Sequence, residues 1–234
     1  VLFYTGVSHK IGEVHDGAAT MDWMEQERER GITIKMTPVR MDYKSHILNL
    51  IDTPGHIDFS YEVSRSLRAV EGALLLVDAT QGVQAQTLTT LEMAKNANLK
   101  IIPVINKIDS QLADIEGVKK QIKNLLEVED NEIMLVSGKT GLGVEELLEE
   151  VINKIPPPNI EIIEKKENTK SFRALIFDFE YSNHEGVILY VRILNGKVKR
   201  NDELLFIKSK HRFIVRNVGV FKPQKTEKNE KTEG

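Results

Sequence analysis

The sequence predicts an α/β domain with a mainly parallel sheet, followed by a smaller antiparallel β module. Between Thr33 and Pro158, short unbroken apolar runs alternate with amphipathic stretches of helical length. Strands that are covered on both faces have this continuous hydrophobic pattern, whereas half-exposed strands alternate. After three consecutive prolines at 156–158 the pattern changes to short strand-like runs separated by turns. This change predicts a second unit of antiparallel strands, part of a β-barrel.

The elements of the first unit follow from this pattern in order. The stretch 32–45 alternates loosely and predicts an edge strand, where Pro38 is tolerated. Four apolar runs then predict strands of the buried sheet, at residues 46–52, 72–79, 99–106 and 132–138. Amphipathic stretches between them predict helices at residues 59–69, 87–98 and 118–127. The three prolines end the last helix and stiffen a linker over residues 159–170.

The second unit is expected over residues 171–223. Its apolar runs predict short strands within residues 173–182, 186–196, 202–210 and 212–221. Asn195 and Gly196 form a tight-turn signal between two of these runs. Residues 224–234 are rich in lysine and glutamate and have no periodicity, so we expect a disordered tail there.

Composition excludes several classes of protein. The chain has 234 residues, of which 41% are hydrophobic and 29% charged, as expected for a folded domain plus part of another. It contains no cysteine, which excludes disulfides and thiolate metal sites. No run approaches the roughly 18 apolar residues of a membrane span, and no signal peptide is visible. We therefore expect no stable membrane insertion.

Charge divides the chain into two parts. Residues 1–164 carry 16 Lys and Arg against 26 Asp and Glu, whereas residues 165–234 carry 16 against 9. The net charge is thus −10 in the first part and +7 in the second. The basic part is either an ordinary solvated lysine surface or a contact surface for a phosphate backbone.

Polar side chains follow the predicted buried strands. Ligands of such sheets bind beyond the carboxyl ends of the strands, where side chains and loop amides emerge. The polar residues at these ends are Asp52, Asp78, Asn106, Asp109 and Ser137. One aspartate after a strand is commonly only a helix N-cap. Polar groups at four strand ends, each with turn residues, indicate a ligand site.

Two of these clusters suit the base of a nucleotide. Asn106 offers an amide, Lys107 has an apolar stem that can cover a ring face, and the Asp109 carboxylate can accept two N–H donors. Guanine presents two adjacent donors at N1 and N2, and adenine lacks this edge. Backbone N–H groups of residues 137–139 could meet a carbonyl such as guanine O6.

Other residues suit the phosphates. Asp52 could lie near a magnesium ion through a bound water, and the Gly55 N–H could point at a terminal phosphate. His56 would then stand beside that phosphate and orient water. The Thr33 hydroxyl could bind magnesium once its loop orders around the phosphate.

The segments "ERERGITI", "DTPGHIDFSYEVSRSLRAVEGALLLVDATQGVQAQT", "PVINKID" and "SGKTGLGVEELLE" resemble the guanine-nucleotide motifs of the translational GTPases. This resemblance implies a P-loop-NTPase-type G domain at 1–158, incomplete at its N-terminus, and a partial β-barrel translation-factor domain at 171–223. It implies His56 as the catalytic residue that positions water, and Mg²⁺ bound by Thr33 and, through water, by Asp52. The implied GTP-binding residues are Asp52, Thr53, Pro54, Gly55, His56, Asn106, Lys107, Ile108, Asp109, Ser137, Gly138 and Lys139.

The resemblance also implies partners and a reaction. The expected partners are guanine nucleotide and the ribosome, through rRNA, ribosomal proteins and tRNA-bound complexes, in the cytoplasm and without DNA. The expected reaction is hydrolysis of GTP to GDP and phosphate on the ribosome. Residues 3–34 resemble a different branch of the superfamily from the rest of the chain.

One family motif is missing. The phosphate-binding loop G-x-x-x-x-G-K-[ST] occurs nowhere in the 234 residues. The chain begins with Val1, and residues 2–4 read as the last turn of a helix, so we expect the first strand and the loop to lie upstream. The chain alone is then expected to be inactive. The alternatives are a fragment of an elongation factor G-type translocase and a ribosome-docking module that does not turn over nucleotide.

Overall fold

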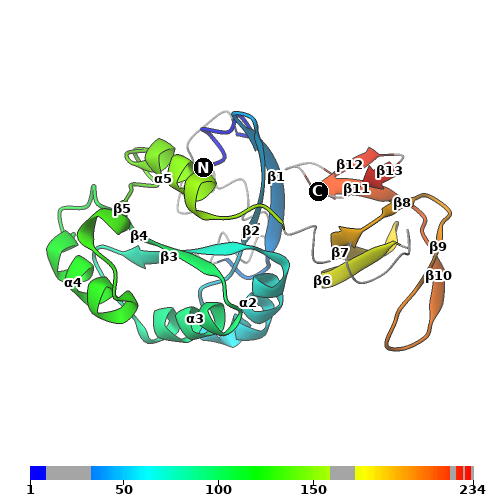
Figure 1. Cartoon of the computed structure of the whole chain (residues 1–234), viewed down its shortest axis with the longest axis horizontal. Coiled ribbons are helices and arrows are strands. Elements are labelled where there is room, and N and C mark those ends of the chain that lie inside the picture. The colour runs from blue at the N-terminus through cyan, green and yellow to red at the C-terminus, as the bar shows by residue number, and fades with distance from the viewer. Residues whose placement is uncertain (9–32, 159–171, 222–224, 229, 233–234) are drawn as a thin grey trace. The chain divides into compact units, whose positions relative to one another are not determined.

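A computed structural model describes residues 1–8, 33–158, 172–221, 225–228 and 230–232. The chain divides into two compact units, residues 1–157 and 158–234 (Figure 1). The division falls within the run of three prolines at 156–158.

The first unit is built on a three-stranded parallel sheet. Its strands are β3 (Gly72–Asp78), β4 (Lys100–Asn106) and β5 (Met134–Leu135), in the order β3-β4-β5. Asp78 and Asn106 are register partners at the carboxyl ends of β3 and β4. The parallel sheet expected from the apolar runs is therefore present, and it brings two of the predicted polar strand ends side by side.

The predicted strand at 46–52 forms, but it does not join this sheet. β2 (His46–Asp52) pairs antiparallel with β1 (Thr37–Tyr43), and this hairpin is separate from the parallel sheet in the part of the chain that the structure describes. β2 is mostly exposed or half-buried, whereas β1 buries Val39 and Met41. The expectation that β2 is buried on both faces is wrong, because an apolar run alone does not identify the partner strand.

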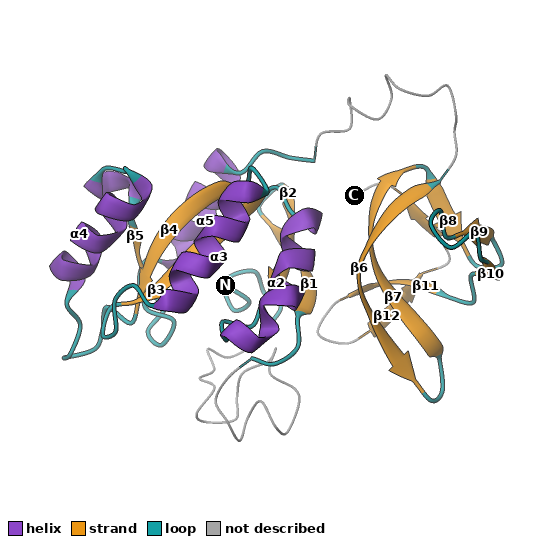
Figure 2. Ribbon diagram, turned by 90° about the horizontal axis from the view of Figure 1, so that it is seen from below, coloured by secondary structure: helices purple, strands orange, loops and turns teal. Residues whose placement is uncertain are grey.

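The helices lie close to their predicted ranges (Figure 2). α2 (Ser60–Ser66) lies between two 3₁₀ turns at Ile57–Phe59 and Leu67–Ala69. The other helices are α3 (Ala85–Asn96), α4 (Ile115–Leu126) and α5 (Val144–Lys154), with a 3₁₀ turn at Asp130–Glu132 before β5. α4 begins where the Asp114 carboxylate accepts a hydrogen bond from the Gly117 N–H at 3.0 Å, an N-cap that satisfies a free amide.

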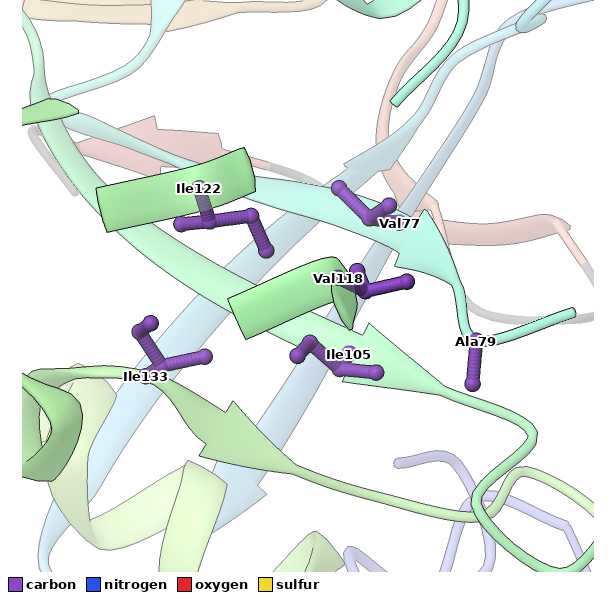
Figure 3. Packing of buried hydrophobic residues seen from close by; sticks show 6 residues of the cluster. All are labelled: Val77, Ala79, Ile105, Val118, Ile122 and Ile133. Atoms are coloured by element: carbon purple, nitrogen blue, oxygen red, sulfur yellow. The ribbon is translucent and has the colours of Figure 1, made fainter. Parts of the chain in front are cut away.

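Both faces of β4, the central strand of the parallel sheet, are covered. Ile105 packs with Val118 and Ile122 of α4, and Figure 3 shows these side chains directed toward one another. Its neighbour Val104 packs instead with Leu147 of α5. Successive residues of a strand point to opposite faces, so residues 101–105 of β4 are all apolar. This accounts for the unbroken hydrophobic run in its sequence.

The second unit consists of paired short strands. Its longest element is the hairpin of β6 (Arg173–Ser182) and β7 (Gly186–Asn195), whose side chains Phe177 and Tyr190 are buried. The chain turns at Gly196, at φ 75°, as the Asn-Gly signal predicts, but the strand that follows does not pair with β7. The remaining strands are β8 (Lys197–Lys199), β9 (Glu203–Leu205), β10 (Arg212–Ile214) and β11 (Val218–Phe221).

The tail differs from its prediction. Two strands lie in the segment expected to be disordered, β12 (Lys225–Lys228) paired with β11, and β13 (Glu230–Thr232) paired with β8. Both pairings are antiparallel and involve backbone groups, which a polar segment carries as fully as an apolar one. Amino-acid composition therefore does not predict strands that form by pairing with the edge of an existing strand.

Candidate functional site

The carboxyl ends of β3, β4 and β5 are joined by hydrogen bonds around Asn106. Its side-chain Oδ1 accepts the Gly138 N–H at 2.9 Å, and its backbone oxygen accepts the Ala79 N–H at 2.9 Å. Ala79 follows β3, and Gly138 lies three residues beyond β5. Asn106 thus fixes the loops of both neighbouring strands. The Gly138 N–H, expected to be offered to a ligand carbonyl, is directed to Asn106.

Asp109 is oriented by Ser137. The Ser137 hydroxyl donates a hydrogen bond to the Asp109 carboxylate, and this is the main cause that lowers the pKa of Asp109 below its ordinary value of 3.8. Desolvation acts in the opposite direction, and the positive charges of Lys139 and Lys107 add to the lowering. Ser137 itself is fully buried, and its Oγ accepts the Thr140 N–H at 3.0 Å. The exposed carboxylate is therefore held ionised and in place.

Lys107 points toward the other neighbouring strand. Its backbone is left-handed, at φ 64°, and its ammonium lies 2.7 Å from Oδ2 of Asp78 at the end of β3. The other oxygen of Asp78 accepts the N–H and the hydroxyl of Thr80, at 2.8 and 2.7 Å. Burial raises the pKa of Asp78, but the hydrogen bonds from Lys107 and Thr80 outweigh it, so the pKa lies below its ordinary value.

This contact of Asp78 is the feature that sequence reasoning missed. The apolar runs identify Asp78 as a polar strand end but give it no role. The available signal is its position, because equivalent residues of adjacent parallel strands lie side by side.

The remaining residues of the two motifs have distinct environments. Ile108 packs against the apolar cluster of Figure 3, so it is a core residue. Gly138 and Lys139 are exposed. The loop that contains them also meets the N-terminal turn, because the Tyr4 hydroxyl donates to the Gly141 backbone oxygen at 3.1 Å.

After β2, Pro54 is buried, whereas Gly55 and His56 are exposed. His56 Nδ1 accepts the Asp58 N–H at 3.3 Å, and the Asp58 carboxylate also lies 3.3 Å from this nitrogen. The side chain is about half exposed, at 51%, so Nε2 can reach water. Thr53, which directly precedes Pro54, is half-buried.

Thr33 precedes the β1–β2 hairpin on the side of Asp52, because Thr37 at the start of β1 is the register partner of Asp52. A hydroxyl and a carboxylate are the hard oxygen donors that Mg²⁺ accepts, so these two residues fit the ion by their chemistry. Among the residues with described positions, no group of three His, Cys, Asp or Glu side chains is arranged to hold a metal ion. Two protein donors with water and phosphate oxygens are nevertheless the usual magnesium environment.

The structure thus brings together part of the predicted site. Residues 106–109 and 137–139 meet at the end of the parallel sheet, while residues 52–56 end a strand of the separate hairpin. At the first group, an oriented carboxylate lies beside a long apolar stem, while the amides of Ser137 and Gly138 donate to Leu142 and Asn106. This arrangement, on a parallel sheet covered on both faces, is typical of an α/β domain that binds the base of a nucleotide.

Comparison with known families agrees. Residues 1–157 match the family described as the elongation factor Tu GTP binding domain. The match covers well over half of the chain, which therefore belongs to this family. The resemblance to translational GTPases seen in the motifs is confirmed.

Two curated relatives of this chain are both named elongation factor 4. The chain is 48% identical over 212 residues to elongation factor 4 of Mycoplasma mobile, covering 91% of this chain and 35% of the relative. It is 51% identical over 209 residues to elongation factor 4 of Thermotoga maritima, covering 87% and 33%. The chain thus spans about a third of the length of these relatives. The names of these relatives agree with the resemblance of the motif segments. Most of those segments resemble LepA, which is also named elongation factor 4, although residues 3–34 resemble elongation factor G.

Solved structures share the fold. A protein of Thermus thermophilus matches with a TM-score of 0.75 at 18% identity, covering all of this chain and 48% of that one. Translation elongation factor SelB of Methanococcus maripaludis, solved with the GTP analogue GppNHp, matches with a TM-score of 0.66 at 26% identity. The latter match covers 86% of this chain and 44% of SelB.

No helix in the described part of the chain is both long and apolar enough to cross a membrane.

Proposed function

We propose that this chain forms the guanine-recognition and switch region of a GTP-binding translation factor of the elongation factor 4 type, together with part of its following β domain. The observation that carries the proposal is the junction at the end of the parallel sheet. There, Asn106 fixes the loop of Gly138, and Ser137 orients the ionised Asp109. The identities of the relatives support the subfamily.

Asp109 selects the base in this proposal. Its carboxylate accepts the N1 and N2 donors of guanine, and its lowered pKa keeps both oxygens available as acceptors at neutral pH. Adenine has no such pair of donors and leaves the carboxylate unpaired. A carboxylate that a bound base covers without donating to it loses its hydrogen bonds to water and gains none. The free-energy cost of this loss therefore disfavours adenine.

The switch residues act on the phosphates. Thr33 and, through water, Asp52 hold Mg²⁺, which neutralises phosphate charge, and the Gly55 N–H meets the terminal phosphate. The half-exposed His56 positions the attacking water through Nε2, because Nδ1 is engaged by the Asp58 N–H. Hydrolysis to GDP and phosphate then depends on positioning and charge stabilisation, without a covalent intermediate.

The ribosome is the proposed partner, in its tRNA-bound states and in the cytoplasm. The basic second unit supports a contact with rRNA, because residues 165–234 carry a net charge of +7. Lys197, Lys199 and Arg200 cluster along β8 and the turn after it, and all of them are exposed. Ribosomal proteins complete the contact surface in this proposal.

The test is equilibrium binding of a fluorescent guanine nucleotide with Mg²⁺. It compares this chain with a longer form that carries the sequence encoded upstream, where we place the strand and phosphate-binding loop. We expect the longer form to bind much more tightly, because the loop supplies amides and a lysine to the phosphates. Asp109→Asn should weaken guanine and admit xanthine, because an amide N–H₂ can donate to the C2 carbonyl of xanthine.

Two results would contradict the proposal. If neither form binds, the residues of the base site are relics and the docking module without turnover is the better explanation. If both bind but Asp109→Asn leaves the preference for guanine unchanged, the base lies elsewhere. Asp130→Asn is the matched control. Asp130 is an exposed carboxylate on another loop, 2.7 Å from the Lys123 ammonium.

A further inference from the structure

We propose that Asp78 is a positioning residue of the base site, which holds the Lys107 side chain extended across the strand ends before the base arrives. This inference rests on the proposed function, because it assigns a role within the same guanine site. The supporting feature is the ion pair between the Lys107 ammonium and Asp78 Oδ2 at 2.7 Å.

The two partners differ in how firmly they are held. The Asp78 side chain is only 21% exposed, and its second oxygen is fixed by two hydrogen bonds from Thr80. The Lys107 side chain is 58% exposed, and its backbone has a left-handed conformation. Asp78 is thus a fixed acceptor for a side chain that would otherwise sample many rotamers.

The order of the strands decides where the stem runs. Lys107 follows β4, and Asp78 ends β3, so the methylene groups of Lys107 extend from one strand end toward the next. The side chains of Asn106 and Asp109 make their contacts on the opposite side, with Gly138 and Ser137 after β5. At the carboxyl end of β4, the apolar stem of Lys107 therefore lies on the side of β3, and the Asp109 carboxylate lies on the side of β5.

A base that contacts Asp109 along its edge can lie with a face against this stem. Because Asp78 has already ordered the stem, the base does not bear the ordering cost on binding, which is the advantage of preorganisation. The effect is independent of which purine substituents are present. Asp78 should therefore change affinity for guanine-type bases without changing selectivity among them.

The experiment uses guanosine, a nucleoside whose binding needs no phosphate contacts, with the longer form that carries the sequence encoded upstream. Binding is followed by NMR through the amide of Gly138, and the readout is the dissociation constant. Asp78→Asn keeps an oxygen for Thr80 but presents an N–H₂ group to the ammonium, so it removes only the contact to Lys107. We expect a dissociation constant about two- to fivefold higher, the range of an exposed ion pair.

Two controls separate positioning from a structural role. Thr90→Ala removes a hydroxyl that donates to the Gln86 backbone oxygen at 2.9 Å within α3 and leaves the ion pair, so we expect unchanged guanosine binding. The double variant of Asp78→Asn and Lys107→Gln should bind no more weakly than Lys107→Gln alone, because both changes remove the same contact. Asp78→Asn should also leave the ratio of guanosine to inosine affinity unchanged.

The outcomes are distinguishable. Equal guanosine binding by the wild-type chain and Asp78→Asn would overturn the role of Asp78 and leave the proposed function intact. Additive losses in the double variant would do the same. If the wild-type form shows no response to guanosine up to its solubility limit, this proposal fails, and the proposed function is decided separately by whether the same form binds the fluorescent guanine nucleotide.

Discussion

At the scale of single residues, Ser137 has the strongest influence on the site. It is fully buried, donates to the Asp109 carboxylate and accepts the Thr140 N–H. One hydroxyl thus orients the group that reads the base and also closes the loop that follows β5. The residue is a small polar side chain whose importance comes from its two partners.

Ser137→Ala should raise the pKa of Asp109 toward its ordinary value, because it removes the main cause of the lowering. The buried Thr140 contact is lost as well, so we expect a decrease of about 1 kcal/mol in the free energy of unfolding. The pKa is measured by carbon NMR of the Asp109 carboxyl, and stability by urea unfolding. Ser110→Ala, which removes only an acceptor for the Leu112 N–H at 3.2 Å, is the control.

The same variant predicts a change in pH dependence. A carboxyl whose pKa is lower in the folded state contributes stability above its ordinary pKa of 3.8, and this contribution is lost as the pH falls through the folded value. Below about pH 4 the wild-type chain should therefore lose stability more steeply than Ser137→Ala. Parallel stability curves for the two proteins at acid pH would contradict the assignment of this hydrogen bond.

At the scale of elements, the start of α5 is the most constrained feature. Its N-cap, Gly143, has φ 74°, and a Cβ placed there would lie 2.0 Å from the Leu135 backbone oxygen. Gly143 is needed for its conformation and for the close approach of β5. This contact couples the helix to the strand that leads into Ser137.

Gly143→Ala should therefore destabilise the first unit by more than backbone strain alone. Left-handed backbone costs a non-glycine residue about 1–2 kcal/mol, and here a carbonyl must move as well. Gly6→Ala is the matched control in the same unit, at φ 71° and with no atom within 4 Å of the added Cβ. Urea unfolding followed by circular dichroism compares the two, and equal losses would show that the contact with Leu135 is unimportant.

The elements also show what sequence can predict. The runs at 46–52, 72–79 and 99–106 predict the strands within one residue, because strand length and continuous apolar character are local properties. Partners are not local: the same type of run forms a hairpin strand in β2 and a core strand in β4. In the base site, the residue types were predictable, but the contact of Lys107 with Asp78 depended on the register between two strands.

At the scale of the whole molecule, the separation of the β1–β2 hairpin from the parallel sheet leaves unpaired strand edges. In the described part of the chain, β2 pairs only with β1, and β3 only with β4. Leu76 of β3 is 54% exposed, although its strand neighbours Leu75 and Val77 are buried. Unpaired edges beside an exposed leucine favour association between chains.

We therefore expect the isolated chain to self-associate or to unfold partially. Light scattering over a range of concentrations should show association, and Leu76→Gln should reduce it. Leu112→Gln is the control, since Leu112 is 81% exposed in a loop away from these edges. A well-dispersed monomer that melts cooperatively would contradict this expectation.

The hydrogen bond from Tyr4 to Gly141 joins residues that are 137 positions apart. A protein is synthesised from its N-terminus, so Tyr4 leaves the exit tunnel long before Gly141 exists. The N-terminal turn must wait for the last loop of the unit before it can dock, and such long-range contacts slow folding. The base-reading loop and the turn that leads toward the switch region are therefore completed together, late in synthesis. A nascent chain that ends before Gly141 would expose both.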